Sequence, residues 1–96
     1  MTNQNSNLIE FYGTECPYCD KIQPLIEKLE QDEGIKIHQL EVWHDDENME
    51  EMMKYREDFL AACGELGVPS FINTKTRKVY CGNLDYDKLK AWALGE

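Results

Sequence analysis

The chain has 96 residues, 42% of them hydrophobic and 30% charged, which fits one small soluble folded domain rather than a disordered segment. Its 19 acidic residues outnumber 10 basic ones, and the formal charge of −9 disfavours nucleic acid and anionic membranes as partners. No apolar run approaches the length of a membrane span, and the start MTNQNSN lacks the basic and apolar parts of a secretory signal. We therefore expect a cytoplasmic, monomeric domain over residues 1–96, with a flexible tail over residues 1–6.

The first third of the chain predicts a strand followed by a helix. Residues 7–12, NLIEFY, form a short run of strand-forming residues that only the acid Glu10 interrupts. Hydrophobic residues then recur at helical spacing over residues 17–32. Pro17 suits the first helical position, where no amide hydrogen is needed, and Pro24 is expected to kink the helix.

A second strand and a second helix are predicted next. Residues 35–42, IKIHQLEV, alternate apolar and polar residues, but the alternation shifts near His38 or Gln39, where we expect a bulge or a change of register. Asp45 or Asp46 is placed to cap a helix that we expect to continue to Cys63. The expected apolar side of this helix comprises Met49, Met52, Met53, Phe59, Leu60 and Cys63.

The last third of the chain predicts a hairpin and a closing helix. Residues 70–73 and 78–81 favour strands and flank a turn at 74–77. Asp85 is expected to cap the last helix, whose apolar side includes Tyr86, Leu89, Trp92 and Ala93. The order β-α-β-α-β-β-α predicts an α/β fold in which three helices flank a four-stranded mixed sheet.

Two of the four cysteines form a C-x-x-C motif where the first strand turns into the first helix. Cys16 falls at the helix start, where free amide groups and the helix dipole stabilise a thiolate, and Cys19 is expected to be more buried. Such a pair suits thiol–disulfide exchange, in which Cys16 attacks a substrate disulfide and Cys19 resolves the mixed disulfide. A structural disulfide, or a zinc site with Cys63 and Cys81 as further ligands, remains an alternative.

These features resemble the thioredoxin superfamily over nearly all of residues 7–95. The C-P-Y-C sequence at residues 16–19 is typical of glutaredoxins, and the short chain matches their smaller layout. Other features are more similar to thioredoxin itself. They are Glu10 six residues before Cys16, Pro24 five residues after Cys19, and the segments GELGVPS and GNLDYDKLKAW.

The resemblance implies roles for individual residues. Val68 and Pro69 would be joined by a cis peptide bond and would lie against the C-x-x-C motif, where a proline keeps metal ions away from the sulfurs. Glu10 would lie below Cys19 as a buried base with a raised pKa and would accept the Cys19 proton. Contacts with the substrate would come from Pro17, Tyr18, Val68 and Gly82.

The chain departs from the family pattern beside the motif. Glu15 stands where thioredoxins usually have Trp, and Asp20 follows Cys19, so that two negative charges oppose a thiolate. Lys21 is the only basic residue near the motif, whereas the two carboxylates of glutathione favour Lys or Arg around the cleft. We therefore expect electrons to come from a flavoprotein disulfide reductase, with glutathione as the alternative reductant.

The prediction is thus a dithiol–disulfide oxidoreductase that reduces or exchanges disulfides in substrate proteins, serving electron transport and cell redox homeostasis. The exchange itself needs no cofactor. One alternative is a glutathione-dependent glutaredoxin. Another is a binding module without enzymatic activity, in which the thiols hold a metal or an iron–sulfur cluster.

The other two cysteines are expected to differ from the motif pair. Cys63, on the core side of a predicted helix, is interpreted as a small buried hydrophobic residue. Cys81 is either a similar packing residue or an additional accessible thiol, because the matching family position lies beside the substrate groove.

Overall fold

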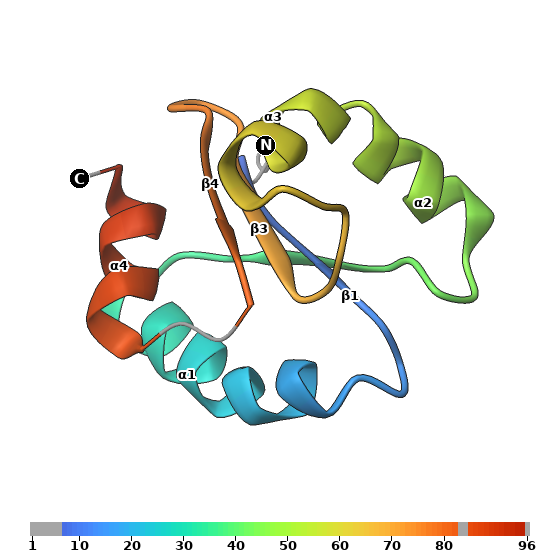
Figure 1. Cartoon of the computed structure of the whole chain (residues 1–96). Coiled ribbons are helices and arrows are strands. Elements are labelled where there is room, and N and C mark those ends of the chain that lie inside the picture. The colour runs from blue at the N-terminus through green and yellow to red at the C-terminus, as the bar shows by residue number, and fades with distance from the viewer. Residues whose placement is uncertain (1–6, 83–84, 96) are drawn as a thin grey trace.

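A four-stranded mixed sheet forms the centre of the computed structural model, which describes residues 7–82 and 85–95 (Figure 1). The strands are β1 (Leu8–Tyr12), β2 (His38–Glu41), β3 (Ser70–Asn73) and β4 (Lys78–Cys81). Their order is β2-β1-β3-β4, with β1 parallel to β2 and the other two pairings antiparallel. The predicted mixed sheet is confirmed, and the expected tail over residues 1–6 lies outside the described residues.

Helices cover both faces of the sheet, so that two hydrophobic clusters form (Figure 1). Helices α1 (Pro17–Glu33) and α4 (Tyr86–Leu94) pack on one face, and α2 (Asp46–Met53) and α3 (Arg56–Cys63) pack on the other. The first cluster holds the buried side chains of Leu8, Ile22, Ile26, Leu29, Ile37, Phe71, Leu89, Trp92 and Ala93. The second holds those of Ile9, Phe11, Val42, Met52, Phe59 and Ile72. Because successive strand residues point to opposite faces, the central strands are apolar on both sides.

Capping residues fix the ends of α1 and α4. Cys16 is the N-cap of α1, Pro17 takes the first helical position as predicted, and Gly34 ends the helix at a positive φ of 64°. Asp85 caps α4 as predicted, and its carboxylate accepts the Lys88 amide hydrogen at 2.9 Å. The N-cap of α1 places the C-x-x-C motif at the first turn of that helix.

The second predicted helix is broken into α2 and α3, so the prediction of one continuous helix is wrong. The break occurs at Lys54 and Tyr55, where the Tyr55 amide donates to the Met52 carbonyl oxygen at 3.0 Å across a tighter turn than that of an α-helix. The break changes which side chains face the sheet. Met52 is buried, whereas Met53 and Leu60, both expected in the core, are 39% and 43% exposed.

Strand β2 is shorter than predicted and contains no bulge. It pairs with β1 in an unbroken parallel register over His38–Glu41, and residues 35–37 precede it. The shift in the apolar pattern reflects a strand that is covered on both faces. Ile37 packs with the cluster under α1 and α4, whereas Val42 packs with the cluster under α2 and α3.

Candidate active site

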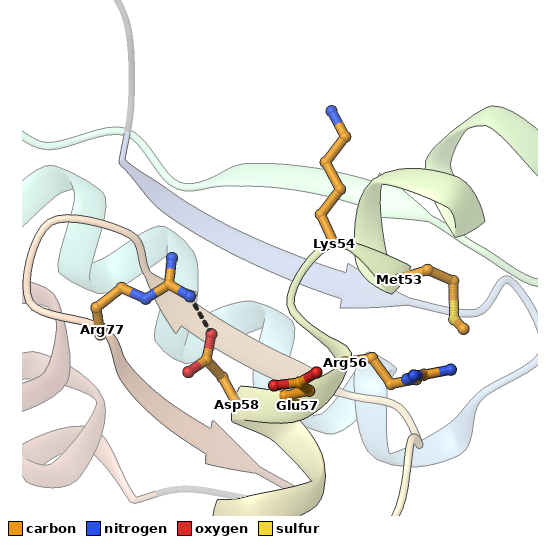
Figure 2. A pocket seen from close by; sticks show the side chains of 6 residues that line it. All are labelled: Met53, Lys54, Arg56, Glu57, Asp58 and Arg77. Atoms are coloured by element: carbon orange, nitrogen blue, oxygen red, sulfur yellow. Dashed lines mark hydrogen bonds and ion pairs between the residues drawn. The ribbon is translucent and has the colours of Figure 1, made fainter.

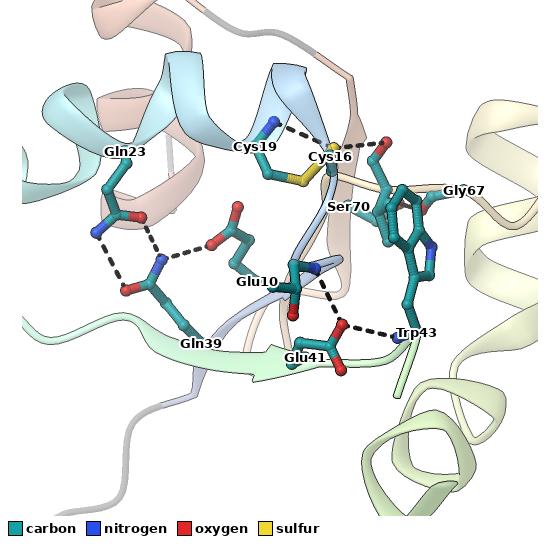
Figure 3. Close-up of a disulfide and its surroundings, with 11 residues drawn as sticks. Glu10, Cys16, Cys19, Gln23, Gln39, Glu41, Trp43, Gly67 and Ser70 are labelled. Carbon is teal, nitrogen blue, oxygen red and sulfur yellow. Dashed lines mark hydrogen bonds between the residues drawn. A yellow bond between two sulfur atoms is a disulfide. The ribbon is translucent and has the colours of Figure 1, made fainter. Parts of the chain in front are cut away.

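A disulfide between Cys16 and Cys19 marks the candidate active site at the turn from β1 into α1 (Figure 3). The two Cα atoms lie 5.2 Å apart. Cys16 lies at the N-cap, as predicted, and its sulfur accepts the Cys19 amide hydrogen at 3.1 Å. In the reduced protein this amide and the positive end of the helix dipole stabilise a Cys16 thiolate.

Solvent exposure does not separate the two cysteines, contrary to expectation. Cys16 is 2% exposed and Cys19 is 4% exposed, so Cys19 is not the more buried of the two. The residues between them are exposed instead, and the Tyr18 ring lies under the Lys21 ammonium group, 5.6 Å from its nitrogen. The difference between the cysteines therefore rests on the helix start rather than on access to solvent.

The segment that leads into β3 lies against the Cys16 sulfur. The Val68–Pro69 peptide bond is cis, and the Val68 carbonyl oxygen lies 3.9 Å from Cys16 Sγ. The Gly82 amide donates to the Pro69 carbonyl oxygen at 2.8 Å, so this amide is used within the protein. Gly82 has a positive φ of 81°, which lets the chain turn away from β4 beside Pro69. The structure thus places Val68 beside Cys16 and links the adjacent Pro69 to Gly82.

Glu10 is buried in the central strand and is only 1% exposed. Burial raises the pKa of its carboxyl group to about 7, and a hydrogen bond from Gln39 opposes this rise. Gln39 Nε2 donates to Glu10 Oε1 at 2.7 Å, whereas Oε2 has no hydrogen-bond partner among the described residues. In Figure 3 this second oxygen points toward Cys19. A carboxyl group with a pKa near neutrality is suited to accepting and returning a proton.

Two glutamines that the sequence analysis did not single out complete the surroundings of Glu10. Gln39 lies opposite Glu10 in the β1–β2 register and exchanges hydrogen bonds with Gln23 of α1, at 2.7 Å and 3.4 Å (Figure 3). An open pocket of about 280 Å³ reaches this group, and its lining residues are Glu10, Tyr12, Cys19, Asp20, Gln23 and Gln39. The pocket gives the carboxyl group a route to solvent. In the sequence, the signal for this group was a polar residue, Gln39, in the strand predicted to pair with the one that holds Glu10.

Glu41 ties the loop after β2 to the turn before Cys16 (Figure 3). Its Oε2 atom accepts the amide hydrogens of Thr14 at 3.0 Å and of Trp43 at 3.2 Å. The Trp43 ring lies against Gly13, where any Cβ atom would overlap it. Trp43 is 49% exposed, so it presents an aromatic surface beside the turn that carries Cys16. No local pattern in the sequence connects Trp43 to the motif, so this contact was not predicted.

The two acids that flank the motif have different surroundings. Glu15 forms an ion pair with His44, whose Nε2 atom lies 2.8 Å from Oε1, and this hydrogen bond raises the pKa of His44. A protonated His44 therefore offsets part of the negative charge that Glu15 places beside Cys16. Asp20 is exposed and lines the pocket that reaches Glu10.

Cys63 and Cys81 form a second disulfide, with Cα atoms 6.2 Å apart. Cys63 is half-buried and bonded rather than a buried free residue, so that expectation is wrong, and Cys81 is not a free thiol. A pocket of about 240 Å³ lies beside the bond and is lined by Cys63, Glu65, Gly67, Val68, Pro69, Cys81 and Gly82. The four cysteines form two disulfides, so they do not form the zinc site that was the alternative to a redox pair. Within residues 7–82 and 85–95 no three His, Cys, Asp or Glu side chains gather where they could hold a metal ion.

A third pocket, of about 300 Å³, adjoins the break between α2 and α3 (Figure 2). Its lining residues are Met53, Lys54, Arg56, Glu57, Asp58 and Arg77. Arg77 forms an ion pair with Asp58 there, so the pocket contains charges of both signs and no cysteine.

None of the helices in the described parts of the chain is long and apolar enough to cross a membrane.

Comparisons with known proteins identify the family and the fold. A family model described as "TraF: F plasmid transfer operon protein" matches residues 1–72. The chain belongs to the TraF family. A crystal structure of a glutaredoxin from Archaeoglobus fulgidus matches with a TM-score of 0.58 and 19% sequence identity, covering 94% of this chain and 95% of that chain. No curated protein matches the chain.

Together these matches confirm the predicted membership of the thioredoxin superfamily and the thioredoxin-like fold. The TraF match includes Cys16, Cys19 and Pro69 but ends before β4. The fold therefore holds a C-x-x-C pair at the start of its first helix. Which reaction that pair performs has to be argued from the site.

Proposed function

We propose that the protein is a thiol–disulfide oxidoreductase that reduces or exchanges disulfides in other proteins through Cys16 and Cys19. The observation that carries the proposal is the position of this pair at the N-terminus of α1, between the Val68–Pro69 segment and the buried Glu10. Each neighbour meets one requirement of the exchange. The helix start stabilises a thiolate, the segment offers a binding edge, and the acid accepts a proton.

The reaction begins with the reduced pair. The Cys16 thiolate attacks one sulfur of a substrate disulfide, forms a mixed disulfide and releases the other substrate sulfur, which takes up a proton. Cys19 then loses its proton and attacks the Cys16 sulfur. The Cys16–Cys19 bond forms, the second substrate sulfur leaves and is protonated, and two electrons have passed from the pair to the substrate.

Glu10 is assigned to the second step, as acceptor of the Cys19 proton. With a pKa of about 7, its carboxyl group is partly ionised near neutral pH and can both take and return a proton. Gln39 engages Oε1 and leaves Oε2 directed toward Cys19 (Figure 3). Glu10 then exchanges this proton with solvent through the pocket that Gln23 and Gln39 line.

An extended segment of the substrate protein is proposed to bind along Val68, with its apolar side chains against Tyr18 and Trp43. These two rings are 56% and 49% exposed; Trp43 lies against Gly13 before Cys16, and Tyr18 lies on the first turn of α1 after it. Acidic side chains surround the site, namely Glu15, Asp20, Glu41 and Glu65. Substrates with basic residues beside their disulfide are therefore favoured.

A dithiol reductase of the flavoprotein class is proposed to return electrons to the Cys16–Cys19 pair. Glutathione carries two carboxylates, which the acidic surroundings repel, and Lys21 is the basic residue that the sequence places beside the motif. The same charges argue against the glutaredoxin alternative. Efficient turnover with glutathione as the only reductant would favour that alternative.

The proposed function is tested by trapping. In Cys19→Ser protein the resolving step is blocked, so Cys16 should accumulate mixed disulfides with substrate proteins that a dithiol releases on a gel. The Cys16→Ser/Cys19→Ser protein is the matched control and should trap nothing. The parent protein should accelerate the reduction of insulin by dithiothreitol. Absence of both trapping and acceleration would contradict the proposal.

A further inference from the structure

We propose that Cys63–Cys81 is a second redox-active disulfide, which a reducing dithiol opens and whose state controls the segment that carries Val68 and Pro69. The effect on substrate affinity rests on the proposed function. The redox behaviour of the pair and its effect on the segment do not.

The second disulfide is more accessible than the first. It joins the last residue of α3 to the last residue of β4, and both cysteines are half-buried, whereas Cys16 and Cys19 are 2% and 4% exposed. It also lines the open pocket of about 240 Å³ that contains Val68, Pro69 and Gly82. A thiolate from another molecule can therefore approach it from the substrate side.

The position of the bond couples it to the Cys16 site. Residues 64–69 connect α3 to β3, and they begin directly after Cys63. The disulfide fixes the start of this segment to β4, while the hydrogen bond from the Gly82 amide to the Pro69 carbonyl oxygen fixes its end. Between these two anchors, the Val68 carbonyl oxygen lies 3.9 Å from Cys16 Sγ. Opening the disulfide releases one of the two anchors.

Ser70 provides a second link between Cys81 and the same segment. Its side chain is 0% exposed, and its Oγ atom donates to the Gly67 carbonyl oxygen while lying 3.9 Å from Cys81 Sγ. A serine hydroxyl has one proton to donate. When Cys81 becomes a thiolate, its charged sulfur competes for that proton with the Gly67 carbonyl. Reduction therefore weakens the hydrogen bond that holds the residue before Val68.

The chemical step is an ordinary thiol–disulfide exchange. A thiolate of the reducing dithiol attacks Cys63 Sγ, the Cys63–Cys81 bond breaks, and Cys81 leaves as a thiolate that Ser70 stabilises. The second thiol of the reductant loses its proton and attacks the reductant sulfur bonded to Cys63, so the reductant leaves as a disulfide. Two electrons move to the pair, one proton of the reductant ends on Cys63, and the other passes to solvent because Cys81 stays a thiolate hydrogen-bonded by Ser70.

The surroundings make this pair the harder one to reduce. Cys63 ends α3, and Glu65 follows it and lines the same pocket. The negative end of the helix dipole and the carboxylate both disfavour a thiolate, which favours the disulfide. As conditions become more reducing, Cys16–Cys19 opens first and the segment stays fixed. Stronger reduction then opens the second pair and loosens the substrate edge.

The first experiment measures the two pairs separately. The full chain is equilibrated in mixtures of reduced and oxidised dithiothreitol without denaturant, free thiols are blocked by alkylation, and each cysteine peptide is quantified by mass spectrometry. We expect two transitions, with the second pair requiring a ratio of reduced to oxidised dithiothreitol about tenfold higher. The transition of the second pair should persist in Cys16→Ser/Cys19→Ser protein. A pair that never oxidises, or that opens only in denaturant, overturns the proposal.

The second experiment measures hydrogen exchange at the amides of residues 64–68 in Cys16→Ser/Cys19→Ser protein. Reduction of the second pair should speed exchange there by about tenfold, with little change in β1. Ser70→Ala removes the hydroxyl link, so it should speed exchange at Gly67 and Val68 in the oxidised protein and shrink the difference between the two redox states. Equal exchange in oxidised and reduced protein overturns the coupling.

The third experiment compares a large and a small substrate. In Cys63→Ser/Cys81→Ser protein, KM for insulin should rise roughly 3- to 10-fold, while kcat/KM for a small aromatic disulfide should stay within about twofold of the parent value. Equal losses for both substrates would show general damage to the Cys16 site and overturn the effect on affinity. A parent protein that reduces no insulin would instead refute the proposed function, and the first two experiments would still decide the redox proposal.

Discussion

Cys16 begins α1, whereas Cys63 ends α3. At the helix start the Cys19 amide donates to the Cys16 sulfur at 3.1 Å. At the helix end the nearby backbone groups are carbonyl oxygens, and Glu65 adds a negative charge beside the pocket. The same residue type therefore receives opposite electrostatic influence in the two disulfides. Helix polarity, rather than exposure, distinguishes the attacking pair, because that pair is the more buried one.

Removal of Cys16 should have the largest effect and is the sharpest test of this contrast. Cys16→Ser should lower the rate of insulin reduction by at least about a thousandfold, because the attacking thiolate is lost. The matched variant Cys63→Ser should lose no more than about tenfold. Turbidity of the insulin chains measures both rates. Losses of similar size in the two variants would contradict the assignment of roles.

Glu10→Gln should stabilise the oxidised protein and slow its chemistry. The folded pKa of about 7 lies above the ordinary value of 4.5, so the unfolded state loses its proton first as pH rises. The native state is therefore penalised above pH 4.5, and the penalty levels off above about pH 7. It reaches about 3 kcal/mol, which the uncharged variant avoids.

Urea unfolding at about pH 4 and about pH 8 measures this effect. Parent and variant should unfold with similar free energies at the lower pH, and the variant should be more stable at the higher pH. Release of the mixed disulfide should slow by about 10- to 100-fold, because Cys19 loses its proton acceptor. Glu50→Gln removes an exposed acid of α2 and should change neither quantity. If Glu10→Gln changed neither the free energy of unfolding nor the rate of release, Glu10 would not be the proton acceptor for Cys19.

Local patterns in the sequence were enough to predict the first and last helices, the approximate positions of the strands and the C-x-x-C pair. Cys16 and Pro17 mark a helix start, Asp85 marks another, and short runs of strand-forming residues mark the strands. The position of Glu10 within an apolar strand likewise predicted a buried acid, and the structure places it there. In each of these cases residues close in the sequence decide the outcome.

Contacts between distant residues could not be predicted in this way. The Trp43 ring on Gly13 and the Cys63–Cys81 bond join parts of the chain that no local rule connects. Four cysteines allow more than one complete pairing, and spacing alone selects none of them. No Gly or Pro stands at the break beside Tyr55, so the sequence contains no signal for it. At the break the Tyr55 ring packs against the core, with its centroid 6.5 Å from that of the Phe11 ring.

Loss of the second disulfide should cost more stability than loss of the first. The two cysteines are separated by 18 positions in the second pair and by 3 in the first. Loop entropy then predicts a loss of about 3 kcal/mol for the longer loop and about 1.5 kcal/mol for the shorter one. Urea unfolding of the two double serine variants beside the oxidised parent measures both values. A larger loss for the Cys16→Ser/Cys19→Ser protein would contradict this order.

Single charges beside the two pairs should have the smallest effects. Because the hydrogen bond with Glu15 raises the pKa of His44, their ion pair contributes stability below the unfolded pKa of His44, and this contribution is lost as pH rises through the folded pKa. Glu15→Gln should therefore lower the pKa of His44 in an NMR titration. It should also speed the alkylation of Cys16 in the reduced protein at neutral pH, since a negative charge beside the thiolate is removed.

Glu65→Gln is the matched change at the other disulfide. It should leave the titrations of His44 and Cys16 unchanged, because Glu65 lines the pocket beside the second pair. It should shift the second pair toward its reduced form in the dithiothreitol titration, since a Cys63 thiolate then meets one negative charge fewer. Alkylation rates of Cys16 as a function of pH, measured in both variants, make the comparison direct. If Glu65→Gln altered the Cys16 rates as much as Glu15→Gln, the two disulfides would share one electrostatic environment, and helix polarity could not be what separates them.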